Sequence, residues 1–180
     1  AHCTMNKTFD INVISNILRF LLLIVLQVFV CNHINLFGFA TPALYLLALL
    51  LLPIELPLSA QYFIGFITGL VVDMFTHTLG VNALACLVVM FVRPYLVKRL
   101  DSGKSTEGIN RLVPGIKDTK WIFFYVILLS LIHQVLVTML ETSSFANFGH
   151  TSLVILCNTV FTSFLLLCCL YIFYPAKSKY

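Results

Sequence analysis

The chain has 180 residues, of which 60% are hydrophobic and only 10% are charged, and its mean hydropathy is +1.00. Soluble domains are about 45–50% apolar and about 25% charged, so a single core of this size could not hide these side chains from water. The composition excludes a soluble protein, and no aromatic-interleaved basic patch indicates nucleic-acid binding. We therefore expect one all-α domain, residues 1–180, that forms a polytopic helical bundle in a membrane.

The first apolar run, residues 14–31, is long enough to span a bilayer and has no small-residue cleavage site after it. It should therefore remain as a membrane span, and Arg19 in its first turns can extend its charge to the surface. The polar tail before this run reaches about Asp10. Residues 1–4 precede Met5, and we interpret them as a cloning remnant.

The second apolar segment, residues 36–52, is bordered and interrupted by proline. Pro42 suits an early helical turn, where its missing N–H is tolerated, and Pro53 and Pro57 end the helix. The uninterrupted stretch 43–52 would cover about half of a hydrocarbon core ~30 Å thick. The segment can be tilted, broken or partly re-entrant, and the sequence leaves these alternatives open.

The third and fourth spans are predicted at residues 58–75 and 81–96, with Arg93 and Pro94 near the end of the fourth. Residues 76–80 between them are too few for anything but a tight turn. The two spans should therefore form an antiparallel pair.

Residues 97–120 form the longest polar segment, and we expect a cytoplasmic basic loop here. Its cations are Lys98, Arg99, Lys104, Arg111, Lys117 and Lys120. Such side chains lie where anionic headgroups concentrate, so contact with membrane lipids is expected. Ser102-Gly103-Lys104-Ser105 resembles a phosphate-binding loop, but position 98 lacks the required glycine and no buried strand precedes it. Nucleotide binding is therefore not expected.

The fifth and sixth spans are predicted at residues 121–140 and 152–174. Trp121 and Tyr125, at the start of the fifth span, suit the headgroup region of a membrane. His133 and Gln134 lie within that span, where a polar side chain most often bonds to a neighbouring helix.

The distribution of positive charge predicts the orientation of the chain. With six spans and the N-terminus inside, all eleven Lys and Arg residues fall on the cytoplasmic side or at its membrane edge. The links expected outside have none. The pattern therefore predicts six transmembrane helices with both termini in the cytoplasm, and it counts the proline-interrupted segment as a crossing.

Gly65, Gly69 and Asp73 are spaced four apart, so they share one face of the third helix. The glycines let another helix backbone approach closely, and the acid needs a partner because a carboxylate at mid-membrane costs about 2.5–3.5 kcal/mol. A structural role is favoured, in which Asp73 accepts hydrogen bonds from Thr76, Thr78 or free N–H groups at the start of the fourth helix. A proton or cation site and a direct contact with a partner are the alternatives.

The same stretch resembles the rod-shape-determining MreD family. The resemblance rests on Gly-x-x-x-Asp at residues 69–73, a short polar link, and Leu-Gly-x-Asn-Ala-Leu at residues 79–84, within a short chain of six apolar segments. Together, the helix face and this motif predict helix-packing or partner-binding roles for Gly65, Gly69, Asp73, Gly80 and Asn82.

Resemblance to this family implies a non-enzymatic scaffold of the cell-elongation machinery in the bacterial inner (cytoplasmic) membrane. The implied partner is the transmembrane helix of MreC, and MreB, RodA and a penicillin-binding transpeptidase are indirect partners in lateral-wall peptidoglycan synthesis.

The MreD family is also similar in fold to the substrate-binding S components of energy-coupling-factor vitamin transporters. That similarity supplies an alternative function, the binding or transport of a small molecule. Such a protein needs a polar pocket that faces outward, and few polar groups are available at the predicted links: Asn32, His33, Asn35, Glu141, Asn147 and His150.

No pattern indicates catalysis, and no cofactor is expected. The chain has no His-Glu-x-x-His, and Asp73 is the only acid clearly within a predicted span. A metal site shared by His33, His77 and His150 across the outside links is the weaker interpretation of these residues. The six cysteines have no Cys-x-x-Cys spacing, so we interpret them as small buried hydrophobes rather than as a disulfide framework.

Overall fold

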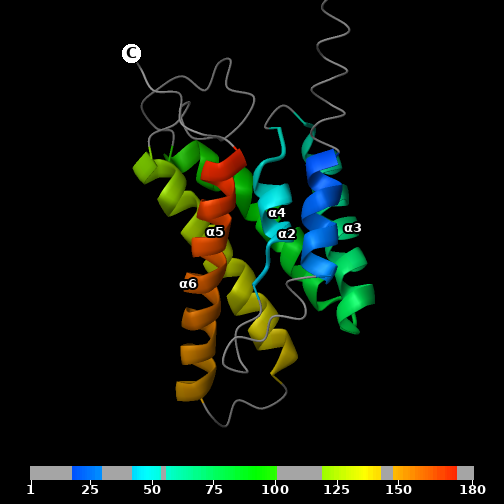
Figure 1. Ribbon diagram of the computed structural model, residues 1–180, viewed down its shortest axis with the longest axis vertical. Coiled ribbons are helices and arrows are strands. Elements are labelled where there is room, and N and C mark those ends of the chain that lie inside the picture. Colours follow the sequence, from blue (N-terminus) through cyan, green and yellow to red (C-terminus); the bar gives the residue numbers. More distant parts are fainter. Residues whose placement is uncertain (1–17, 30–41, 54–55, 101–118, 143–147, 174–180) are drawn as a thin grey trace, which may run out of the picture.

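The computed structural model describes residues 18–29, 42–53, 56–100, 119–142 and 148–173 (Figure 1). These residues contain helices and turns and no strand. The helices are Leu18–Phe29, α2 (Tyr45–Leu50), α3 (Leu58–Thr76), α4 (Val81–Leu100), α5 (Thr119–Glu141) and α6 (Phe148–Phe173). The last four are long and apolar enough to cross a membrane. The structure therefore supports an all-α membrane bundle, whereas six spans and cytoplasmic termini stay predictions.

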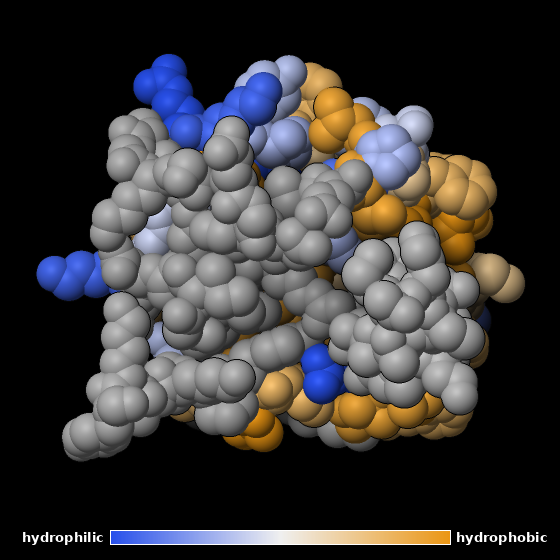
Figure 2. Space-filling model, turned by 90° about the horizontal axis from the view of Figure 1, so that it is seen from above, coloured by the Kyte–Doolittle hydropathy of each residue, from blue (hydrophilic) through white to orange (hydrophobic). Residues whose placement is uncertain are grey.

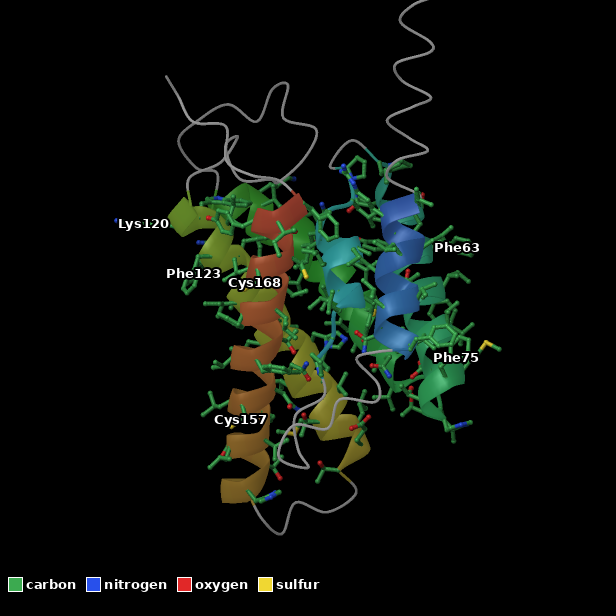
Figure 3. The ribbon with its side chains drawn as sticks, viewed as in Figure 1. Phe63, Phe75, Lys120, Phe123, Cys157 and Cys168 are labelled. Carbon is green, nitrogen blue, oxygen red and sulfur yellow. The ribbon has the colours of Figure 1, made fainter. Side chains whose placement is uncertain are left out.

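The outer surface of the bundle is apolar, as contact with lipid requires. Phe63 and Phe75 on α3 are 67% and 56% exposed, and Phe123 on α5 is 52% exposed. Figure 3 shows all three pointing away from the other helices. Exposed aromatic side chains in this number would make an aggregation-prone surface in water, but they suit the acyl chains of a bilayer.

The four described cysteines are free thiols. Cys86 is buried, as expected from the sequence. The expectation of burial is wrong for Cys157, which is exposed on α6 (Figure 3), because the outer surface of a membrane bundle accepts apolar groups as readily as its core.

Successive long helices run in opposite directions between two ends of the bundle (Figure 1). One end of the bundle contains the end of α4, the start of α5 and the end of α6. The other end contains the α3–α4 turn and the end of α5. α3 packs on α4, α4 on α5, and α5 on α6. The predicted antiparallel pairing of the third and fourth spans is therefore confirmed.

The two ends of the bundle differ in charge. The described cations nearest one end are Arg19, Lys98, Arg99 and Lys120, and we call this the basic end. Figure 2 looks onto it and shows hydrophilic side chains in blue at the rim, next to an orange apolar flank. The two described acids, Asp73 and Glu141, lie toward the opposite end, which we call the acidic end. This asymmetry agrees with the charge pattern on which the predicted orientation rests.

The proline-interrupted segment forms only a short helix in the centre of the bundle. α2 has six residues, which at 1.5 Å per residue cover about 9 Å, or roughly a third of a hydrocarbon core. All six are buried, with exposed fractions from 0% to 5%. Of the alternatives that the sequence leaves open, a broken helix is the one seen in the described part, residues 42–53.

Two predicted boundaries are wrong. The fourth helix does not end at Leu96 but continues through Pro94 to Leu100, so Lys98 and Arg99 belong to its last turn rather than to a loop. The sixth helix begins at Phe148 rather than at Ser152. Proline removes one backbone hydrogen bond, and the packing of α4 between α3 and α5 holds the helix across that gap.

Candidate functional site

The candidate site begins at the junction of α3 and α4, where Asp73 is buried and 3% exposed. Its Oδ1 accepts hydrogen bonds from the Thr78 hydroxyl, from the Asn82 backbone N–H at 3.0 Å and from the Asn82 side-chain amide at 3.0 Å. Its Oδ2 accepts from the Ala83 backbone N–H at 2.9 Å. These donors are of the kinds that the structural interpretation expects, a threonine of the turn and free N–H groups at the start of α4.

The turn between the helices aims the start of α4 at this carboxylate. His77 ends α3 in the left-handed region, with φ of 57°, and Gly80 precedes α4 with φ of 82°. These two reversals bring the first turn of α4 back over Asp73. The free N–H groups there carry partial positive charge, so an anion at this point stabilises the helix.

Gly65 and Gly69 lie on the face of α3 that contacts α4. A Cβ added at Gly69 would lie 2.4 Å from Ala83 Cα and 2.5 Å from the Asn82 carbonyl oxygen, both of which are backbone atoms. A Cβ added at Gly65 would meet the flexible Met90 side chain, with Cγ at 2.6 Å. The face is therefore occupied within the chain, and a role for it in binding a partner stays a prediction.

A chain of buried hydrogen bonds continues from this junction into the bundle. The Tyr45 hydroxyl of α2 donates to Asn82 Oδ1 at 2.9 Å and lies 2.7 Å from His133 Nε2 of α5. The Tyr45 and His133 rings meet edge to face, with centroids 5.6 Å apart. Beside them, Gln134 Nε2 donates to the Thr162 hydroxyl of α6 at 3.0 Å. His133 and Gln134 thus bond to other helices, as predicted.

The start of α2 is held by side chains from other helices. Gln27 Oε1 accepts from the Leu44 N–H at 2.6 Å, and Gln27 Nε2 donates to the Pro42 carbonyl at 2.9 Å. The Ala43 N–H donates to the Thr162 hydroxyl at 3.4 Å. A helix that starts inside the bundle leaves backbone groups that water cannot reach, and these side chains satisfy them.

The end of α2 is held by Arg93, which is 2% exposed. Its Nη2 donates to the Leu50 carbonyl at 3.4 Å and to the Leu52 carbonyl, and its Nη1 donates to Gln61 Oε1 at 2.8 Å. Its Nε donates to the Tyr125 hydroxyl at 3.0 Å. A cation at the C-terminus of a helix is favoured by the helix dipole, and these acceptors offset part of the cost of burying it.

These contacts add two facts that the sequence did not predict. Arg93 is buried against α2, α3 and α5, because the interrupted helix offers it free carbonyls. Tyr125 is 2% exposed and bonds Arg93, whereas the depth of both residues in a membrane stays a prediction. The signal that could have revealed Arg93 is a cation inside an otherwise apolar run, which in a membrane marks a position with a specific partner.

A cavity of about 200 Å³ lies beside the Tyr45–His133 pair, toward the acidic end. Its polar described lining comes from the Leu18–Phe29 helix, α2, α3, the α3–α4 turn, α4 and α5: Gln27, Tyr45, Thr76, Thr78, Asn82, His133, Gln134 and Glu141. Glu141 was expected to contribute to an outward pocket, whereas the other lining residues were not. Small-molecule sites commonly lie between the helices of a bundle and carry a few polar groups that orient the ligand.

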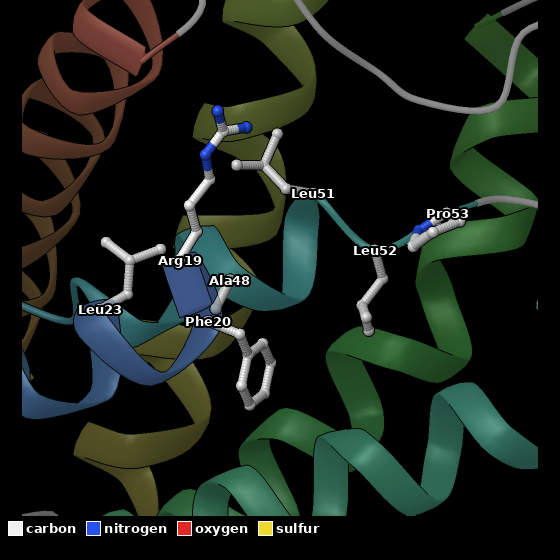
Figure 4. Close-up of a pocket in the computed structure, with 7 residues that line it drawn as sticks. All are labelled: Arg19, Phe20, Leu23, Ala48, Leu51, Leu52 and Pro53. Atoms are coloured by element: carbon white, nitrogen blue, oxygen red, sulfur yellow. The ribbon is translucent and has the colours of Figure 1, made fainter. Parts of the chain in front are cut away.

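A second pocket, of about 50 Å³, lies between the Leu18–Phe29 helix and the end of α2 (Figure 4). Apart from Arg19, which extends past Leu51, its described lining is apolar. One water molecule takes up about 30 Å³ in the liquid, so a pocket of about 50 Å³ has room for one or two waters and is too small for an organic ligand.

The structure brings together the motif residues of the α3–α4 junction, Gly65, Gly69, Asp73, Gly80 and Asn82. The exposed cations Lys98, Arg99 and Lys120 lie apart from this junction, at the basic end of the bundle. Seven of the predicted loop and link residues lie outside the described part of the chain: Lys104, Arg111, Lys117, Asn32, His33, Asn35 and Asn147. His150 belongs to α6 rather than to a link. No cluster of three metal-ligating side chains occurs in the described part of the chain.

Comparison of the chain with protein-family models, with curated proteins and with solved structures gave no match.

Proposed function

We propose that the chain is a non-enzymatic scaffold of the MreD type in the bacterial inner membrane, which binds MreC and helps to organise lateral-wall peptidoglycan synthesis. The observation that carries the proposal is the α3–α4 junction. Asp73 and Asn82 of the MreD-like motif are joined there by hydrogen bonds, Gly69 lies against α4, and both oxygens of Asp73 accept hydrogen bonds from the turn or the start of α4. An acid engaged in this way stabilises the packing of α3 against α4.

In this proposal the transmembrane helix of MreC packs on an outer face of the bundle. In this proposal the groove along Gly65 and Gly69 serves the packing of α4. MreB, RodA and a penicillin-binding transpeptidase act through the wider complex, and the cations of the basic end contact anionic lipid.

The test is co-purification with affinity-tagged MreC from bacterial membranes in a mild detergent. We expect the chain to remain on the resin with MreC, and to be lost at least tenfold when the transmembrane helix of MreC is replaced by an unrelated apolar helix. The replacement keeps the soluble region of MreC and is the matched control. Equal retention with both forms, or retention with neither, would contradict the proposal.

The polar cavity favours a second candidate function, the binding or transport of a small molecule in the manner of an S component. A scaffold has no need for a cavity of about 200 Å³ lined by an imidazole, amides, hydroxyls and a carboxylate. Mass spectrometry of small molecules released from the purified chain tests this candidate. A stoichiometric compound supports ligand binding, and its absence together with retention on MreC supports the scaffold alone.

A further inference from the structure

The cavity beside Tyr45 and His133 carries an inference about the class of molecule that it binds. This inference rests on the second candidate function and is independent of the scaffold. It follows from the direction of the hydrogen bonds behind the cavity wall and from the charges around it.

Asp73 fixes the orientation of the Asn82 amide. The Asn82 Nδ2 group donates to Asp73 Oδ1 at 3.0 Å and to the Thr78 hydroxyl at 3.2 Å, so its oxygen must face Tyr45. The Tyr45 hydroxyl has one proton, and it donates that proton to Asn82 Oδ1. The hydroxyl can therefore only accept from His133 Nε2 across their 2.7 Å separation.

The direction of this chain selects the tautomer of His133. Nε2 carries the proton, and Nδ1 of the neutral ring is left as an acceptor. His133 is 1% exposed, and Nδ1 has no hydrogen-bond partner among the described residues. An unpaired buried acceptor is costly, roughly 1–3 kcal/mol, so the wall at His133 favours a ligand that donates hydrogen bonds over one that accepts them.

The charge around the cavity has one sign. Glu141 ends α5 at the cavity, and Asp73 lies behind Thr78 and Asn82, which form part of the wall. The described lining contains no Lys or Arg. A cation in the cavity would be attracted by both carboxylates, whereas an anion would be repelled.

We propose that this cavity binds a small organic ammonium ion, with Glu141 as its counter-ion and the polar wall around His133 accepting its hydrogen bonds. The volume of about 200 Å³ limits the size of the ligand. A cavity of about 150 Å³ holds one benzene molecule, so the ion has one ring at most or a comparably short chain.

Thermal unfolding of the purified full chain in detergent tests this inference. The ammonium probes are ethanolamine and piperidine, and the matched neutral and anionic probes are ethylene glycol and glycolate at the same ionic strength. We expect a concentration-dependent rise in Tm with the ammonium probes alone. Glu141→Gln should weaken their apparent affinity at least tenfold, whereas Lys120→Gln, at the other end of α5, should leave it unchanged.

Glu141 is exposed at the end of its helix, so the Gln variant should fold and keep the Tm of the parent chain without probe. A response to ethylene glycol or glycolate that equals the response to ethanolamine would overturn the ammonium class while leaving small-molecule binding in place. No response to any probe would overturn the inference, and a compound released from the purified chain would still support the second candidate function.

Discussion

Arg93 on α4 donates a hydrogen bond to the carbonyl oxygen of Leu52, just beyond the end of α2, and so joins the one described helix that stops inside the bundle to one that runs its length. Backbone carbonyls cannot be left unpaired in a lipid environment. This contact therefore decides whether the broken segment is stable.

Replacing Arg93 with methionine should destabilise the isolated protein, because the Leu52 carbonyl and the Gln61 amide oxygen would lose their donor. The Leu50 carbonyl would keep only the hydrogen bond from the Tyr125 hydroxyl at 3.5 Å. The loss should be about 3 kcal/mol or more, since each unpaired buried group costs roughly 1–3 kcal/mol. Arg93→Lys keeps the charge but not the planar fork, and its loss should be intermediate. Thermal unfolding in one detergent ranks the variants, and a methionine variant as stable as the parent would refute this role.

Asp73→Asn should also be destabilising, by about 1–3 kcal/mol. Both carboxylate oxygens accept hydrogen bonds, so an amide would place its NH₂ group against a donor such as the Ala83 N–H. Asparagine keeps a hydrogen-bonding group and removes only the charge, so a structural role by itself would predict tolerance, but two accepting oxygens reverse that expectation. Asp73→Leu removes both acceptors and should be worse.

The control for the Asp73→Asn and Asp73→Leu variants is the retention of each on MreC, measured on the same preparations. If Asp73→Asn keeps the parent stability and still retains MreC but fails to support rod shape, the structural role is wrong and an ion site becomes the better interpretation.

The two glycines of the α3 face should differ in their tolerance of alanine. Gly69→Ala places its Cβ against the backbone of α4, which cannot move aside, and should cost about 1–3 kcal/mol. Gly65→Ala meets the flexible Met90 side chain, and the higher helix propensity of alanine, about 1 kcal/mol, offsets the strain. Unfolding curves measured side by side give the difference. Equal losses would mean that α3 and α4 do not pack in this register.

The predicted orientation can be checked at two described positions. Leu79 is fully exposed in the α3–α4 turn, and Lys120 is exposed at the basic end. In a background without native cysteines, Leu79→Cys should react with an impermeant maleimide on intact cells, and Lys120→Cys should react only after permeabilisation. Labelling of both from one side would show that the predicted topology is wrong.

The cations of the basic end should stabilise the protein in anionic lipid. Each exposed Lys or Arg near such a surface contributes roughly 1 kcal/mol. Replacing Lys98, Arg99 and Lys120 with glutamine should therefore reduce the difference in Tm between anionic and zwitterionic nanodiscs. An unchanged difference would indicate that these charges serve only to orient the chain.

The sequence alone determined the long helices and two kinds of donor at Asp73, a threonine of the turn and the N–H groups that begin α4, but not the Asn82 side-chain amide. Apolar runs of about 20 residues can only be helices in lipid, because the backbone must satisfy its own hydrogen bonds. The five-residue link forced α3 and α4 into an antiparallel pair, and that pairing left few donors within reach of the carboxylate. These features depend on residues that are close in the chain.

Only the tertiary structure decided the path of the segment around α2, the burial of Arg93 and the Tyr45–His133 contact. The partners of Arg93 and the two members of the Tyr45–His133 contact lie 32 to 88 residues apart in the chain. Helix periodicity reveals an inner face when the outer face is polar, but in lipid both faces are apolar and the pattern is weak. The arrangement of helices therefore had to be known before the cavity between them, and the polar groups on its wall, could be found.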